Sequence, residues 1–256
     1  RSNGARRYRR CYKKIARKNG KSTEEAIRLL GHLFLDDLQG AQGFCAANKE
    51  DQAKIVLNMA GQIARQTPAL NKHLQMYESR GIISRIIYYR NNSYVEAIGS
   101  DSKRQDGRSP SWVSYDEWHE AKNDSLLNVL ESGMGARTMP GPMTDIITTA
   151  GFNKEGPCFH YEQYCKDVLE GKIQDDNIYA LIFDQDEESE WDNSPMWKKS
   201  NPNIGVSVFP NFLEARFNEA VNMGGTKEVD FKTKNLNMWT DASSVWINDE
   251  VWRSSS

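Results

Sequence analysis

The chain has 256 residues, of which 38% are hydrophobic and 27% charged, and its formal net charge is -2. This length fits one large domain, or one domain with a linker, and the 26 aromatic residues supply enough apolar surface for a core. The near-neutral charge gives no information on nucleic-acid binding. No apolar run approaches membrane-spanning length and no signal peptide opens the chain, so we expect no membrane partner. The four cysteines form no C-x-x-C pair, which argues against structural zinc.

The hydrophobic pattern predicts an alternation of strands and helices. Strands are expected at 12–16, 43–47, 81–89, 93–99, 112–115, 145–150 and 178–183, and helices at 22–35, 49–67, 125–131, 161–170 and 212–223. Residues 228–235 fit either structure. The alternation indicates an α/β fold, a mostly parallel sheet flanked by helices over residues 1–183, followed by a linker or subdomain over 184–256.

The segment 17–23 reads RKNGKST and lies between the first predicted strand and helix. In a phosphate-binding loop of this kind, backbone N–H groups bind phosphate oxygens, Lys21 reaches the β/γ-phosphates, and Ser22 ligates Mg²⁺. Ile15 replaces the usual first glycine, so a lysine-rich turn that caps the helix through Ser22 or Thr23 is the alternative. The nucleotide-binding candidates are Arg17, Lys18, Asn19, Gly20, Lys21, Ser22 and Thr23.

Two carboxylates, Asp116 and Glu117, end the apolar run that begins at Trp112. Asp116 would hold Mg²⁺ through its water shell, and Glu117 would orient and deprotonate the attacking water. An exposed loop pair is the alternative, but the upstream Gly-Lys-Ser sequence favours a nucleoside triphosphatase. The order Asp-Glu-x-His-Glu does not match H-E-x-x-H, so a zinc protease is rejected.

Two hydroxyl residues, Thr148 and Thr149, end the strand predicted at 145–150. In nucleic-acid translocases a hydroxyl pair at this place senses the γ-phosphate or water and relays its loss to motion. Threonine is also common in ordinary strands, which is the alternative.

These motifs, in this order, resemble the large subunit of tailed-phage terminases, the ATPase that drives DNA into a prohead, and in particular the branch typified by phage HK97. The resemblance covers most of the chain. It includes the phosphate loop, the Asp-Glu-x-His-Glu and Thr-Thr-Ala-Gly sequences, and the segments Cys45–Ala53, Trp197–Asn203 and Asn235–Trp239.

The resemblance implies a RecA-like (ASCE) P-loop core with an additional strand, ATP and Mg²⁺ as cofactors, and a location in the host cytoplasm. It implies double-stranded DNA, the portal protein of the prohead, the small terminase subunit and a homo-oligomeric ring of five subunits as partners. Arg17 would touch the γ-phosphate in cis. Arg104, ranked before Arg108 and Arg137, would act in trans on the ATP of a neighbouring subunit.

The same resemblance leads us to expect ATP hydrolysis without DNA cleavage. The nuclease domain of the family follows the ATPase and needs a carboxylate cluster that binds metal. Little chain follows Trp246, and the acidic run Asp184–Asp192 is expected to be a solvated loop.

Two other functions stay open. A helicase-like ATPase would share the Asp-Glu-x-His and Thr-Thr sequences, although residues 184–256 are too short for a second RecA-like domain. A non-catalytic DNA-binding or assembly module would use the basic block in residues 1–21 on DNA phosphates and would keep only a vestigial nucleotide site.

Overall fold

The structure of the protein is a computed structural model that describes residues 4–101, 105–137 and 139–241. Arg104, the arginine expected to act in trans, lies outside these ranges. Within them, no helix combines the length and the apolar character needed to cross a membrane.

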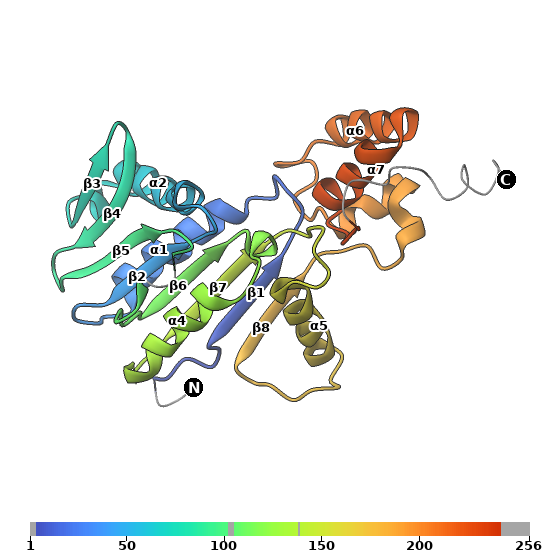
Figure 1. The fold of residues 1–256 in the computed structure, drawn as a ribbon. Helices are drawn as coiled ribbons and strands as arrows, with labels where there is room; N and C mark the ends of the chain where they lie inside the picture. The colour runs from blue at the N-terminus through green and yellow to red at the C-terminus, as the bar shows by residue number, and fades with distance from the viewer. Residues whose placement is uncertain (1–3, 102–104, 138, 242–256) are drawn as a thin grey trace.

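An eight-stranded sheet in the order β3-β4-β5-β2-β6-β7-β1-β8 forms the centre of the fold (Figure 1). The strands from β5 to β8 in this order are parallel, and β4 runs antiparallel to both β3 and β5. The predicted mostly parallel sheet is therefore confirmed. The strand bounds are β1 Arg10–Lys14, β2 Gln42–Ala46, β3 Leu74–Ser79, β4 Ile82–Tyr88, β5 Ser93–Ile98, β6 Trp112–Asp116, β7 Met143–Thr148 and β8 Ile178–Ile182.

Strand β7 lies between β1 and β6. This is the position of the additional strand expected for the RecA-like core, so the three motif-bearing strands are neighbours. Because parallel strands end at the same edge of a sheet, the residues that follow β1, β6 and β7 meet there.

The helices cover both faces of the sheet (Figure 1). Alternate residues of each strand point to opposite faces. Cys11 and Trp112 pack in the cluster under α1 and α2, and their neighbours Tyr12 and Val113 pack under α4 and α5. The helix bounds are α1 Lys21–Leu35, α2 Glu50–Gln66, α3 Pro68–Asn71, α4 Ser125–Gly133, α5 Pro157–Leu169, α6 Pro210–Met223 and α7 Gly225–Asp230.

Two local features differ from the sequence predictions. Strand β3 was not predicted, because it is a short edge strand in which only Leu74 and Met76 pack against the core while the other residues are exposed. The undecided segment 228–235 is helical, with α7 followed by a π-helical turn at Phe231–Asn235.

The chain after β8 builds a small separate cluster around Trp197, Leu213 and Phe231, all of which are buried. Helix α6 contributes Leu213 and Ala220 to this cluster, and Phe231 follows α7 directly. Both helices lie beyond the sheet near the ends of β1 and β8 (Figure 1). We call residues 184–241 the C-terminal segment.

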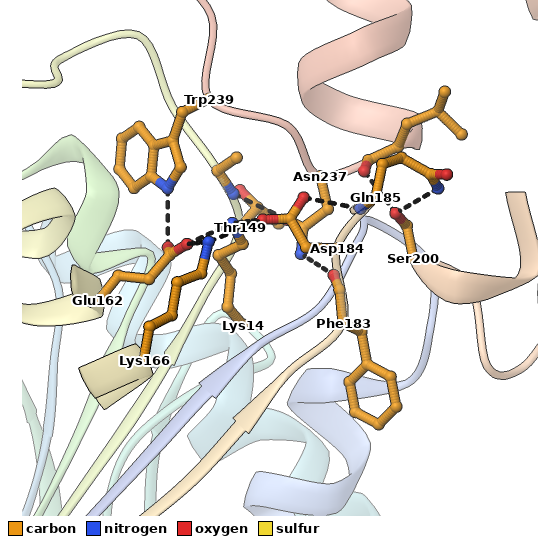
Figure 2. Close-up of polar contacts among 12 residues, drawn as sticks. Lys14, Thr149, Glu162, Lys166, Phe183, Asp184, Gln185, Ser200, Asn237 and Trp239 are labelled. Atoms are coloured by element: carbon orange, nitrogen blue, oxygen red, sulfur yellow. Dashed lines mark hydrogen bonds and ion pairs between the residues drawn. The ribbon is translucent and has the colours of Figure 1, made fainter. Parts of the chain in front are cut away.

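A buried ion cluster joins the C-terminal segment to the sheet (Figure 2). Lys14 at the end of β1 is fully buried, and its Nζ lies 2.8 Å from Glu162 Oε1 and 2.7 Å from Asp184 Oδ2. Lys166 pairs with the same two carboxylates, and Trp239 Nε1 donates to Glu162 Oε2 at 2.7 Å. Burial tends to raise the pKa of Glu162, but Lys14 and Lys166 outweigh it and hold this pKa below its usual value.

Removing the cation of Lys14 leaves the buried Glu162 and the nearby Asp184 with only the partly exposed Lys166 as a shared cation. We therefore expect Lys14→Met to lower the free energy of unfolding by about 3–5 kcal/mol, as for other broken buried ion pairs. The neighbouring Lys13 pairs with the half-exposed Glu24, so Lys13→Met is expected to cost less than about 1 kcal/mol. Urea unfolding of the two variants measures the difference, and equal losses would contradict a structural role for the cluster.

Candidate functional site

The phosphate-loop candidate connects β1 to α1 and contains two left-handed residues. Lys18 has φ 68° and Gly20 has φ 84°. Glycine adopts such angles freely, whereas for lysine the left-handed region costs about 1 kcal/mol. No side chain caps the start of α1 at Gly20, so the first amides of the helix stay available to an anion.

A cavity of about 670 Å³ opens in front of this loop. It brings six of the seven loop candidates together with both predicted carboxylates. Asn19 does not line it, because this side chain is buried and directed away from the cavity. The lining residues are Arg17, Lys18, Gly20, Lys21, Ser22, Thr23, Gln52, Ile55, Met59, Asp116, Glu117, Glu120 and Ser207.

Lys21 is the buried cation of the cavity, with 7% of its surface exposed. Its Nζ donates to the carbonyl of Ile15 at 3.1 Å, so the lysine closes the loop on itself. Burial lowers the pKa of Lys21, and the nearby carboxylates of Glu117 and Asp116 oppose this effect. An incoming phosphate would give this partly desolvated amine a partner of opposite charge.

Asp116 ends β6 opposite the loop and is 6% exposed. Burial and the adjacent Glu117 raise the pKa of Asp116 to about 7, against the effect of Lys21. Its Oδ1 is buried and has no hydrogen-bond partner within the described part of the chain. A buried carboxylate oxygen without a partner is costly, and it fits a ligand that binds from the cavity side.

Glu117 follows β6 in a left-handed conformation, with φ 52°. Such strain in a residue other than glycine is often found at functional sites. Burial tends to raise the pKa of Glu117, but the hydrogen bond from His119 and the charges of Lys21 and Arg17 lower it to about 2. The carboxylate is thus ionised at neutral pH and is oriented by His119 Nδ1, 3.1 Å from Oε2.

The two predicted coupling threonines have different partners. Thr149 Oγ1 donates to Glu117 Oε2 at 3.3 Å and therefore touches the second carboxylate. Thr148 is fully buried and accepts the backbone N–H of His119 at 3.0 Å, while its hydroxyl donates to the carbonyl of Thr149. The end of β7 thus supports both Glu117 and the residue that orients it.

The arginine candidates are distributed unequally. Arg17 is exposed, lines the cavity, and forms no ion pair among the residues described. Arg108 forms an ion pair with Glu96, and Arg137 donates to the carbonyl of Ser109 at 2.6 Å, so both are engaged within the subunit.

Sequence reasoning missed part of the cavity wall. Gln52, Ile55 and Met59 come from one face of α2, and Ser207 comes from the C-terminal segment. Gln52 lies within the segment Cys45–Ala53, and Ile55 and Met59 follow it on the same helix. That segment could therefore have indicated this part of the wall. Nothing in the sequence indicates that Ser207 returns to the loop.

Comparisons with known proteins agree with this geometry. A family model described as the terminase large subunit, ATPase domain, matches residues 1–167. Protein YmfN of Escherichia coli is 40% identical over 154 residues, which are 60% of this chain and 33% of that protein. The HK97 bacteriophage large terminase has a TM-score of 0.79 at 24% identity, over 96% of this chain and 50% of that one. The chain thus spans half or less of these relatives.

A further structure is the large terminase of a thermophilic bacteriophage in complex with ATP-γ-S. Its TM-score is 0.55 at 11% identity, over 91% of this chain and 48% of that one. At this identity the likeness shows the fold alone.

One prediction is corrected by the comparisons. We expected no nuclease in this chain, but a model described as the terminase large subunit, endonuclease domain, matches residues 172–255. The prediction was wrong because it counted only the residues after Trp246. The match begins directly after α5 and includes β8 and the whole C-terminal segment.

The ATPase-domain match covers more than half of the chain, and the same residues hold the phosphate loop, the acidic pair and the additional strand. The chain therefore belongs to the terminase large subunit family of DNA-packaging motors, and it carries the ATPase domain of that family.

Proposed function

We propose that the cavity binds ATP with Mg²⁺ and hydrolyses it to move double-stranded DNA into a prohead. The proposal rests on one observation above all. Lys21, Asp116 and Glu117 line the same cavity at the ends of β1 and β6. A buried cation, a carboxylate with one unpaired oxygen among the described residues and an oriented ionised carboxylate are the groups that phosphoryl transfer to water needs. The ATP-γ-S in a relative of the same fold supports the choice of nucleotide.

The residues present fit a magnesium ion. Ser22 and Asp116 both line the cavity, and the buried Oδ1 of Asp116 has no partner of its own. Mg²⁺ usually takes one or two protein oxygens, with water and substrate phosphates as the remaining ligands. When bound, the ion would neutralise charge on the phosphate oxygens.

The roles of the remaining side chains follow from their positions. Lys21 and the amides at the start of α1 would bind the β- and γ-phosphates, and Arg17 would reach the γ-phosphate from the exposed rim. Glu117 would orient the attacking water. Its lowered pKa keeps the carboxylate ionised, so that it can accept a hydrogen bond from that water.

Thr148 and Thr149 would couple the reaction to DNA movement. Thr149 contacts Glu117, and the backbone after it contacts the C-terminal segment, since Ala150 N donates to Asn237 Oδ1 at 2.8 Å. Thr149 and Asn237 lie close together in Figure 2. A change in the contacts of Glu117 can therefore reach the C-terminal segment through its hydrogen bond with Thr149, the peptide bond to Ala150 and the hydrogen bond from Ala150 to Asn237. We propose further that the chain acts in the host cytoplasm as part of a ring of five subunits. Its partners would be the portal protein and the small terminase subunit.

A non-catalytic DNA-binding module is less well supported. It would use the basic block at the start of the chain, but Arg6, Arg10, Lys13 and Lys14 form ion pairs within the chain. These side chains contribute to the fold, and a DNA contact would compete with their partners. The helicase-like alternative gains no specific contact from the structure.

Replacing the ionised acceptor tests the proposed reaction. We expect Glu117→Gln to lower kcat about 10²–10⁴-fold while the Kd for ATP stays close to that of the unmodified chain, because glutamine keeps the shape but not the charge. Lys21→Ala should lose ATP binding, and Glu155→Gln, at an exposed carboxylate that does not line the cavity, should retain activity. Phosphate release and nucleotide binding measure both quantities, and undiminished turnover in Glu117→Gln would refute the assignment.

The assignment of Arg104 in trans has a separate test. A ring with shared sites predicts that a mixture of Arg104→Ala and Glu117→Gln subunits recovers part of the turnover, since each supplies what its neighbour lacks. The control is a mixture of Lys21→Ala and Glu117→Gln subunits. Each of these subunits has a defect in its own nucleotide site, so the mixture contains no intact site. Turnover no greater in the first mixture than in the second would remove Arg104 from the mechanism.

A further inference from the structure

The inner side of the phosphate loop is held by residues from the C-terminal segment. Asn19, the one loop candidate that does not line the cavity, is 4% exposed. Its Nδ2 donates to Asn201 Oδ1 at 2.8 Å, and its Oδ1 accepts the backbone N–H of Asn203 at 3.1 Å. Asn19 is therefore bound to a part of the chain that lies more than 180 residues further on.

Asn203 completes this arrangement from the other side. Its Nδ2 donates to the carbonyl of Asn19 at 2.7 Å, and the same nitrogen lies next to Gly20, 3.4 Å from the position of a Cβ built there. Asn203 thus contacts the backbone at the turn that leads into α1. Its own position is fixed by the fully buried Asn201, whose Nδ2 donates to the carbonyl of Asn235 at 2.8 Å.

Two further hydrogen bonds also join the loop to the C-terminal segment. The hydroxyl of Ser207 donates to the carbonyl of Lys18 at 2.7 Å, and the amide of Arg17 donates to the carbonyl of Lys234 at 3.2 Å. The carbonyls of Lys18 and Asn19 are both occupied by side chains of the C-terminal segment. Carbonyl oxygens repel phosphate, so engaging these two in hydrogen bonds leaves the amides at the start of α1 for the anion.

From these contacts we infer that Asn203, with Asn201 and Ser207, is a positioning residue that holds the phosphate loop in its anion-binding shape. We call residues 201–207 the clamp. The loop has Ile15 where the usual pattern has a glycine, and it holds Lys18 in a left-handed conformation. Such a conformation persists when the surroundings over-determine it, and the clamp supplies these surroundings. The inference rests on the proposed function for its ligand, ATP.

The variant Asn203→Ala removes the side-chain Nδ2 that donates to the carbonyl of Asn19, and it introduces no charge near the phosphates. The backbone N–H of Asn203 that donates to Asn19 Oδ1 is retained. The matched control is Asn211→Ala, since Asn211 is exposed in the same segment and accepts only the neighbouring amide of Phe212. Three quantities are measured on each chain: amide hydrogen exchange of residues 17–22 without nucleotide, the Kd for ATP with Mg²⁺, and kcat.

The clamp predicts that Asn203→Ala exchanges the loop amides faster and raises the Kd for ATP about tenfold, which corresponds to about 1.4 kcal/mol. The change in kcat should be much smaller, since Lys21, Asp116 and Glu117 are intact. Asn211→Ala should match the unmodified chain in all three. If Asn203→Ala does not fold, Ser207→Ala replaces it, because Ser207 is exposed and loses only the bond to Lys18.

Two results would overturn the clamp. Unchanged exchange of the loop amides would show that the C-terminal segment does not restrain the loop. Faster exchange with an unchanged Kd would show that the contacts serve only the fold. Failure of the unmodified chain to bind ATP would refute the proposed function instead, and the exchange of the loop amides would then decide whether the clamp exists.

Discussion

The candidate site depends on the placement of one buried amine, Lys21, opposite two carboxylates, Asp116 and Glu117. Burial lowers the pKa of Lys21, and the carboxylates oppose this effect by favouring its charged form. The two carboxylates differ in turn, since the pKa of Asp116 is raised to about 7 and that of Glu117 is lowered to about 2. This difference comes from their surroundings rather than from their residue types.

The fold brings these groups together through strand order. Strands β1, β7 and β6 are neighbours, so the loop after β1, the threonines at the end of β7 and the acids after β6 share one edge. The C-terminal segment reaches the same edge from outside. It is fixed to the end of β1 by the buried ion cluster of Lys14, and Asn237 connects it to both Ala150 and Phe183 (Figure 2). A segment that matches an endonuclease domain is thus in direct contact with the parts of the ATPase domain that surround the nucleotide site.

Much of this arrangement could be predicted from the sequence, because periodic apolar runs and short motifs are local signals. The alternation of strands and helices, the loop with Lys21 and Ser22, and the pair Asp116 and Glu117 all belong to this class. The exposed edge strand β3 could not be predicted, since only Leu74 and Met76 pack against the core and two residues give too short an apolar signal. The contacts of Asn19 with Asn201 and Asn203 join distant parts of the chain, and no pattern within either part indicates them. The extent of the endonuclease match was missed for a related reason, because the length left after Trp246 does not show where that domain begins.

In the proposed function, the triphosphate of ATP lies across the loop between β1 and α1, with Lys21 and Asp116 on opposite sides of it. A crystal structure of this chain with a non-hydrolysable ATP analogue and Mg²⁺ would show whether it does. We expect Lys21 Nζ to leave the carbonyl of Ile15 for a phosphate oxygen, and the ion to lie between Ser22, Asp116 and the phosphates. An analogue bound elsewhere, or a triphosphate without contact to Lys21, would contradict this description of the site.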